Sequence, residues 1–324
     1  MPHALIPLNW SHCISETETS FRRSFYSKSL KARANSVFSV NSFSRIVLIT
    51  GFAFIILTVG LPSFAYGSNI SAQTISANHL SLSASKILKS VNWGGYEVNS
   101  SSGSVVAAKA SWIQPSVTCN NPSDTEAVAF WVGIDGFMSS TVEQIGTIAI
   151  CVGGQIVYGA WYEFYPGQPN IIPITNIAVN PGDVFTASVT YVTSSKLFVA
   201  SITDLTNSQT NSTSASVSGA ERNSAEWIVE APSSTSGILP MPNFGTVSFG
   251  KSFTSVSGTC TETLIVSGKA VTHPIGGWGT LKTPGTSKFA ITMVSYYNPK
   301  VVKASVSRLS PGSSFTAAWH NPGP

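Results

Sequence analysis

QIVYGAWYEFY, residues Gln155–Tyr165, is the clearest β-strand pattern in the chain. Successive side chains of a β-strand point to opposite faces, so this stretch has one apolar face and one mixed face. The apolar face can pack against a second sheet and carries Ile156, Tyr158, Ala160, Tyr162 and Phe164. The mixed face suits either a substrate-binding surface or an ordinary solvated strand, and carries Gln155, Val157, Gly159, Trp161, Glu163 and Tyr165.

Similar strand-like runs recur from Asn92 to the end of the chain, and no convincing helix pattern interrupts them. Further strands are predicted at Val105–Ile113, Ala127–Ile134, Val142–Cys151, Val184–Tyr191, Leu197–Thr203, Ala225–Glu230, Thr246–Thr254, Phe289–Tyr296 and Ser314–Trp319. A turn is predicted at Asn180–Asp183, and Asp204–Asn207 is predicted to close a hairpin. Many short strands over about 230 residues indicate an all-β sandwich or barrel.

The composition agrees with an all-β domain and argues against some classes of function. Charged residues make up 10% of the 324 residues, against roughly 25% in ordinary soluble domains. Six of the 18 Lys and Arg and two of the 14 Asp and Glu lie in residues 1–45, so the rest of the chain is neutral. Without a basic patch, nothing favours nucleic-acid binding. Few charges also limit self-repulsion in acid, which permits acid tolerance.

Residues 1–65 are predicted to be a long leader that contains a signal peptide. The apolar run Ile46–Leu61 would span about 24 Å as a helix, less than the roughly 30 Å of a bilayer core. Ser63 and Ala65 are small, as signal cleavage requires, so we expect cleavage after Ala65. A retained membrane anchor or a buried core segment are the alternatives. Residues 66–90 are rich in Ser, Ala and Asn and are predicted to be a short pro-segment or linker.

Three of the four cysteines lie beyond the leader, namely Cys119, Cys151 and Cys260. An odd number in an exported protein leaves one thiol unpaired. Cys119 and Cys151 flank neighbouring strand-like runs, so we expect a disulfide between them and a free Cys260. No zinc-ligand spacing and no HExxH motif is found, and we expect neither metal nor cofactor.

The stretch AEWIVE, Ala225–Glu230, supplies candidate acids. On a strand, Glu226 and Glu230 share a face with Ile228, while the intervening side chains point to the core. Burial in a groove could give the two acids different pKa values, whereas a polar face toward solvent would give them no special role. Gln144 in VEQIG is a further candidate, because a side-chain amide can donate to a developing oxyanion without titrating.

Other catalytic sets are missing from the sequence. There is no GxSxG elbow, no P-loop, no dinucleotide fingerprint and no pair of aspartic-protease motifs. The histidines beyond the leader, His79, His273 and His320, are isolated from any candidate nucleophile. We interpret them as surface or packing residues.

Five motifs taken together resemble the glutamic peptidases, a family of acid proteases. They are NWGGY (Asn92–Tyr96), WVGIDG (Trp131–Gly136), EQIG (Glu143–Gly146), AWYEFYP (Ala160–Pro166) and AEWIVE (Ala225–Glu230). They occur in family order, and the closing stretch ITMVSYYN…SRLSPGSSFTAAW resembles the family's C-terminal strands. The resemblance implies a catalytic domain at residues 91–319, followed by a tail at residues 320–324.

The resemblance also implies a fold and a mechanism. The family fold is a two-sheet antiparallel β-sandwich of the concanavalin A-like lectin and glucanase type. Gln144 matches the family's catalytic Gln and Glu230 its catalytic Glu. The implied protein is a secreted, pepstatin-insensitive endopeptidase in which Glu230 activates water and then protonates the leaving amine, while Gln144 stabilises the oxyanion. The expected substrate-binding residues are Trp131, Asp135, Trp161, Glu163, Tyr165 and Glu226.

Two positions depart from the family pattern. Fungal members carry acids where this chain has Ile148 and Gly159, and fewer carboxylates in the groove are expected to raise the pH optimum or to change subsite preference. We expect polypeptide substrates, a monomer, no nucleic-acid partner, and no membrane contact unless the leader is retained.

Two other functions compete with the peptidase interpretation. Glu226 and Glu230 resemble the paired carboxylates of retaining glucanases, so a glycan-hydrolysing or glycan-binding sandwich is one alternative. Four residues of extended strand span about 13 Å, however, and such enzymes need carboxyl groups about 5–5.5 Å apart. A non-catalytic surface or adhesion module is the other alternative.

Overall fold

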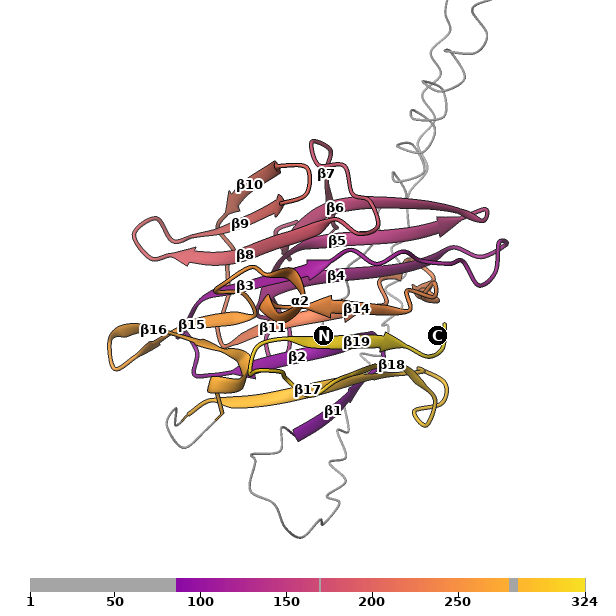
Figure 1. The fold of residues 1–324 in the computed structure, drawn as a ribbon. Coiled ribbons are helices and arrows are strands. Elements are labelled where there is room, and N and C mark those ends of the chain that lie inside the picture. The colour runs from indigo at the N-terminus through magenta and orange to yellow at the C-terminus, as the bar shows by residue number, and fades with distance from the viewer. Residues whose placement is uncertain (1–85, 169, 280–284, 324) are drawn as a thin grey trace, which may run out of the picture. The chain divides into compact units, whose positions relative to one another are not determined.

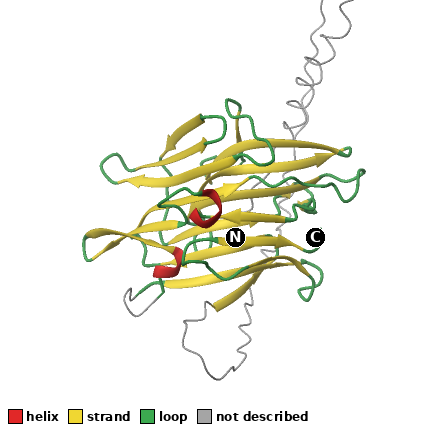
Figure 2. Cartoon of the chain, viewed as in Figure 1, coloured by secondary structure: helices red, strands yellow, loops and turns green. Residues whose placement is uncertain are grey.

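The computed structural model describes residues 86–168, 170–279 and 285–323, which form an all-β structure (Figure 2). The predicted leader, its apolar run and residues 66–85 of the predicted pro-segment lie outside the described residues. No helix among the described residues is long and apolar enough to cross a membrane. The helical elements of the described chain are short: α2 (Lys251–Thr254) and the 3-10 helix η1 (Ile275–Gly277).

Eight strands pair side by side in what we call the β11 layer (Figure 1). In spatial order they are β1 (Lys86–Ser90), β17 (Ser287–Val294), β2 (Trp93–Asn99), β11 (Ser224–Glu230), β4 (Glu126–Ile134), β5 (Val142–Val152), β6 (Gln155–Tyr165) and β7 (Ile172–Ile174). Every pair is antiparallel except β1–β17, which is parallel. The last five residues of the predicted linker thus form the edge strand of this layer.

The remaining long strands form a second set, the β3 layer. They are β10 (Gln209–Ala215), β9 (Leu197–Asp204), β8 (Val184–Val192), β3 (Val105–Ile113), β14 (Thr246–Phe249), β15 (Thr261–Val266), β16 (Lys269–Pro274), β19 (Phe315–Trp319) and β18 (Val302–Val306). Strand β3 pairs with β8 on one side and with both β14 and β15 on the other. A small separate hairpin joins β12 (Ser233–Ser234) to β13 (Gly237–Ile238).

The two layers are joined where β18 of the β3 layer pairs with β17 of the β11 layer. The strands therefore form one continuous, nearly closed network of 17 strands instead of the two separate sheets that the sequence analysis predicted. The all-β class and the antiparallel pairing are confirmed, and the division into two sheets is not. The pairing shifts register between Met293 and Val294, where β17 turns toward β18.

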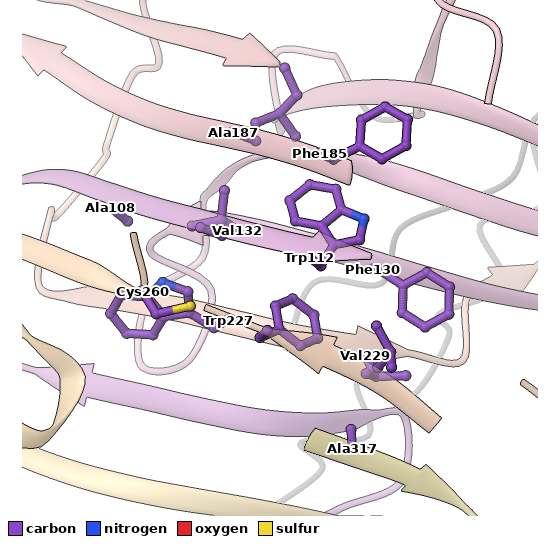
Figure 3. Packing of buried hydrophobic residues seen from close by; sticks show 14 of the residues in the cluster. Ala108, Trp112, Phe130, Val132, Phe185, Ala187, Trp227, Val229, Cys260 and Ala317 are labelled. Atoms are coloured by element: carbon purple, nitrogen blue, oxygen red, sulfur yellow. The ribbon is translucent and has the colours of Figure 1, made fainter. Parts of the chain in front are cut away.

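The main hydrophobic core lies between the two layers (Figure 3). Trp112 of β3 stacks on Phe185 of β8, with ring centroids 5.8 Å apart. The Trp112 indole also donates a hydrogen bond to the hydroxyl of Thr147 on β5, at 3.0 Å, and so links the layers. From the other layer, Trp227 and Val229 of β11 point into the same core, as the alternation in AEWIVE predicts.

Most strands predicted from alternation are present, and two of them, β3 and β6, have the predicted bounds. The strand predicted at Thr246–Thr254 is wrong in its second half. Strand β14 ends at Phe249 because Gly250 adopts φ +92°, a conformation that β-strands do not use, and α2 follows. The strands without a counterpart among the predicted ones are β1, β2, β7, β10, β12, β13, β15, β16 and β18.

Candidate active site

The β11 layer buries both of its faces. One face contributes to the main core, and the other carries a second apolar cluster formed by Trp93, Ala127, Ala129, Trp131, Ile148, Ile150, Trp161, Ile171, Ile228, Leu239 and Ile291. Three tryptophans in this cluster are fully buried. Polar groups on this second face therefore lie in an apolar environment, where hydrogen bonds and charges interact more strongly than in water.

A row of polar residues crosses this second face. Directly opposite residues of neighbouring antiparallel strands point to the same face, so cross-strand pairing identifies the row. Its members are Glu97 on β2, Glu226 on β11, Gly133 on β4, Gln144 on β5 and Glu163 on β6. Two predicted site residues, Gln144 and Glu163, are thus nearest neighbours.

Gln144 and Glu163 form a close hydrogen bond. The Gln144 Nε2 donates to Glu163 Oε2 at 2.6 Å. Burial raises the pKa of Glu163 to about 8, the bond from Gln144 partly offsets this, and the charge of Glu230 raises the pKa further. Glu163 is therefore protonated and neutral in acid, and it lies within electrostatic reach of Glu230.

Glu230 lies near the end of β11 and its carboxylate is held by two donors. Trp131 Nε1 donates to Oε2 at 2.8 Å, and Asn92 Nδ2 donates to Oε1 at 3.4 Å. Trp93, which lies directly opposite Glu230 on β2, packs edge-on against Trp131 with centroids 5.1 Å apart. The Glu230 side chain is 1% exposed, so these donors fix its orientation in a dry environment.

Trp131 contacts Glu230 and the strand partner of Gln144. While its indole nitrogen contacts Glu230, the opposite edge of the ring lies over Gly133. A Cβ atom added to Gly133 would lie 2.9 Å from Trp131 Cζ3 and 3.3 Å from Gln144 Cβ. The indole therefore lies between the Glu230 carboxylate and Gly133, the residue that pairs directly with Gln144 on β5.

Glu226 faces Glu97 directly across the β11–β2 pair. Both side chains are completely buried, and within the described residues none of their carboxyl oxygens accepts a hydrogen bond of good geometry. Burial raises the pKa of Glu226 well above its usual value, and the neighbouring Glu97 raises it further. Two like charges cannot both be ionised at this distance without a large cost, so the pair is neutral in acid.

The other predicted groove residues have different surroundings. Trp161 lies on the same face, directly opposite Gly146, and is fully buried. Tyr165 ends β6 opposite Val142 and is only partly buried. Asp135 follows β4, and its carboxylate accepts from the backbone N–H groups of Arg222 and Asn223 at 2.7 and 2.9 Å. Those bonds tie Asp135 to the residues that lead into β11.

The two positions that depart from the family pattern are neighbours. Ile148 on β5 lies directly opposite Gly159 on β6, on the same face as Gln144. Ile148 is buried in the second apolar cluster. Acidic side chains at these two positions would therefore be direct cross-strand neighbours. In this chain the same position on the face is apolar.

The predicted disulfide between Cys119 and Cys151 is present, and Cys260 is free and buried. Among the described residues no group of three or more His, Cys, Asp or Glu side chains is arranged to hold a metal ion.

Asn92, Trp93 and Glu97 contact site residues but were not among the predicted ones. The first two lie in the NWGGY motif, so the motif itself was the available signal. Glu97 follows that motif by one residue, and only the strand register identifies its partner Glu226.

An amide and carboxyl groups gathered on one buried face of an all-β fold form the side-chain set of a hydrolytic site. A sequence model of the Peptidase A4 family matches residues 91–296. The chain therefore belongs to this family, the eqolisin-type glutamic peptidases.

Relatives and solved structures agree with the family. Aspergillopepsin-2 of Aspergillus niger is 35% identical over 132 residues, which cover 39% of this chain and 45% of aspergillopepsin-2, less than half of that protein's length. Scytalido-glutamic peptidase, solved with a transition state analog inhibitor, has a TM-score of 0.52 at 23% identity and covers 71% of this chain and 98% of its own. SCP-B, an eqolisin solved with the tripeptide Ala-Ile-His, has a TM-score of 0.50 at 22% identity, with the same coverage. These structures show that the fold is shared.

Proposed function

We propose that this chain is an acid endopeptidase that cleaves polypeptides by direct attack of water, with Glu230 as general base and acid and Gln144 as oxyanion stabiliser. The observation that carries the proposal is the position of the Trp131 indole, which donates to the Glu230 carboxylate while its far edge lies beside Gly133, the direct cross-strand partner of Gln144. Family membership and a relative named aspergillopepsin support the same reaction class. The family's concanavalin-like sandwich is the fold that this proposal assumes.

The reaction needs one proton carrier. Glu230 as carboxylate takes a proton from water, and the resulting hydroxide attacks the carbonyl carbon of the substrate. The Gln144 amide donates to the carbonyl oxygen as it becomes negative. Protonated Glu230 then gives its proton to the amine nitrogen while the C–N bond breaks, which restores the carboxylate.

Glu163 has a positioning role in this scheme. Its bond to Gln144 Nε2 fixes the plane of the amide, so that the second N–H of the same nitrogen stays available for the substrate. Because the pKa of Glu163 is about 8, it carries no charge in acid. Glu230 is then not opposed by a second negative charge, and it can remain the one ionised carboxylate of this group at low pH.

Access to the site must change during the catalytic cycle or during maturation. Gln144 and Glu230 are 2% and 1% exposed in this chain, so neither can meet a substrate as they stand. We propose that the groove opens in acid or after loss of the leader, and that the mature protein is secreted and monomeric. Activity that rises after incubation in acid, with a shortened chain in mass spectrometry, would agree with this; full activity of the intact chain would not.

The geometry weakens the glycan-hydrolase alternative. Strand β11 pairs with β2 and β4 without a shift in register, so no bulge brings Glu226 toward Glu230. The side chain between them on the same face is Ile228. The two carboxyl groups are therefore about four strand residues apart, roughly 13 Å, instead of the 5–5.5 Å of a retaining pair.

A substrate panel tests the proposed function. Purified protein is incubated with denatured casein or haemoglobin, and separately with β-glucan, across pH 2–6 and with or without pepstatin. We expect pepstatin-insensitive release of peptides, no release of sugar, and loss of activity in Gln144→Ala by about 10²–10³-fold. Release of sugar, or full inhibition by pepstatin, would reject the proposal.

A further inference from the structure

A cavity of about 290 Å³ lies between the β8–β9 hairpin and the segment that leads into β11. It is lined by Tyr191, Lys196, Phe198, Ser216, Val217, Ser218, Ala220 and Arg222. Two cations and two hydroxyl groups surround an aromatic floor, and no acidic side chain takes part in the lining. We call it the Arg222 pocket.

The Arg222 guanidinium is held in place without a carboxylate partner. It lies over the Tyr191 ring, with Cζ 4.0 Å from the ring centroid, and Nη1 donates to the Val105 carbonyl at 3.2 Å. No carboxylate of the described residues lies within ion-pair distance of Arg222 or Lys196. Stacking on the ring and the hydrogen bond to a carbonyl fix the plane of the guanidinium and leave its other N–H groups free. A guanidinium held in this way can bind a carboxylate through two parallel hydrogen bonds.

The acids nearest in sequence and space are already engaged. Asp135 accepts from the backbone of Arg222 and Asn223, and Thr141 donates to it as well. The exposed Glu221 accepts from the Asn223 amide at 2.7 Å. The buried Glu143 also interacts with the charge of Arg222, but burial raises the pKa of Glu143 well above its usual value. Glu143 is therefore neutral in acid and leaves the charge of Arg222 available to an anion from outside.

The rest of the pocket indicates what kind of anion fits. The half-buried side chains of Tyr191, Val217 and Ala220 supply apolar surface, and Phe198, which is only 1% exposed, packs beneath Tyr191 with ring centroids 5.0 Å apart. An inorganic phosphate or sulfate would leave this surface exposed to water. The Ser216 and Ser218 hydroxyls, which make no hydrogen bond within the described residues, could serve a neighbouring amide. The volume, at the low end of about 300–1,000 Å³ for ligand sites, suits one or two amino-acid residues.

We propose that the Arg222 pocket binds the C-terminal residue of a peptide, with its α-carboxylate on Arg222 and its apolar side chain on Tyr191, Val217 and Ala220. Lys196 adds a second positive charge at the rim. The site itself is independent of the catalytic assignment; that cleavage products are its natural ligands rests on the proposed endopeptidase function, since each cleavage creates a new C-terminal carboxylate.

The test uses the full chain with Glu230→Gln, so that no probe is hydrolysed. Calorimetry at about pH 5, where a peptide α-carboxyl of pKa about 3.3–3.7 is ionised, compares N-acetyl-Ala-Phe with its C-terminal amide. We expect the acid to bind with a Kd of about 0.1–1 mM and the amide at least tenfold more weakly. Binding of the acid should also weaken about tenfold when the pH falls to about 2.5, because the carboxyl group becomes protonated. Equal binding of acid and amide overturns the proposal.

Variants locate the site. Arg222→Met keeps the apolar stem of the side chain and should weaken binding of the acid peptide at least tenfold, and Arg222→Lys should recover part of that binding. The control is Lys251→Ala, which removes an exposed cation of α2 outside the pocket lining and should leave binding unchanged. Unchanged binding by Arg222→Met places the peptide elsewhere, for example in the catalytic groove, and rejects the site. Displacement of the peptide by equimolar inorganic phosphate would also reject it, in favour of a bare anion site. If Arg222→Met fails to fold, the comparison of acid with amide decides alone.

Discussion

Replacing Glu163 by Gln should remove part of the pH dependence of stability. The folded protein holds the Glu163 proton up to a pKa of about 8, whereas the unfolded chain releases it near 4.5. Between these values the native state binds more protons than the unfolded state, so the free energy of unfolding falls as the pH rises. Each pH unit in this range lowers the free energy of unfolding by about 1.4 kcal/mol, so the loss is about 3 kcal/mol at pH 7 and about 5 kcal/mol above pH 8. Glu163→Gln has no proton to lose.

Four more buried acids act in the same direction. Glu97, Glu143, Glu226 and Glu262 are fully buried, and among the residues that the structure describes no donor makes a hydrogen bond of good geometry to their carboxyl oxygens. Burial is the main cause that raises the pKa of each of them well above the usual value. Because a domain has only about 5–15 kcal/mol of stability, several such ionisations together should unfold the protein near neutral pH. The fold is therefore expected to be stable in acid and unstable at pH 7 and above.

The assay is urea unfolding followed by tryptophan fluorescence at half-unit steps from pH 3 to pH 7. For Glu163→Gln we expect the slope of unfolding free energy against pH above about pH 5 to be smaller by about 1.4 kcal/mol per unit than in the wild type. Glu221→Gln, which alters an exposed carboxylate, is the matched control and should keep the wild-type slope. If Glu163→Gln keeps the wild-type slope, or if the wild-type protein is more stable at pH 7 than at pH 4, then burial does not raise the pKa of Glu163 as the structure indicates.

Three further changes probe the site and the fold. Trp131→Phe removes the hydrogen-bond donor to Glu230 and should move the acid limb of the kcat/KM–pH profile to higher pH by about one pH unit. An acid limb at the wild-type pH would count against this hydrogen bond. Gly146→Ala would place a Cβ 2.6 Å from Trp131 Cβ and against a backbone carbonyl, so urea unfolding should show a loss of about 1–3 kcal/mol; wild-type stability would contradict this packing. Replacing Cys119 and Cys151 together by Ala should cost about 2–4 kcal/mol in the same assay, and no loss would mean that the bridge is not formed in solution.

Strand alternation predicted well which side chains of a strand point into the core. In QIVYGAWYEFY, Tyr158, Ala160, Tyr162 and Phe164 contribute to the main core as expected. Ile156, near the start of the same face, is 38% exposed because the first residues of β6 extend beyond the opposite layer's cover. Alternation depends only on backbone geometry, so it holds wherever a strand is regular.

Features that depend on long-range pairing could not be predicted. The strand β18 has only five residues, VKASV, and although they alternate, so short a run does not identify its partner, yet its pairing with β17 joins the layers. Asp135 was expected in the groove because it lies in a family motif. Only the three-dimensional structure shows that its carboxylate binds the backbone that enters β11.

The candidate catalytic residues illustrate the same limit. Sequence position could nominate Gln144 and Glu230, but the Trp131–Glu230 and Gln144–Glu163 hydrogen bonds follow from the way the strands pair. No local pattern records which residue lies opposite which on a neighbouring strand.

The most direct test of the account is kcat/KM for a peptide substrate in acid, measured for purified Glu230→Gln beside Asp124→Asn, a change in an exposed loop carboxylate. With circular dichroism showing both variants folded, Glu230→Gln should lose at least 10²–10⁴-fold in kcat/KM, and Asp124→Asn should match the wild type. A folded Glu230→Gln variant that keeps more than a tenth of the wild-type kcat/KM would show that the Glu230 carboxylate does not transfer the proton in catalysis.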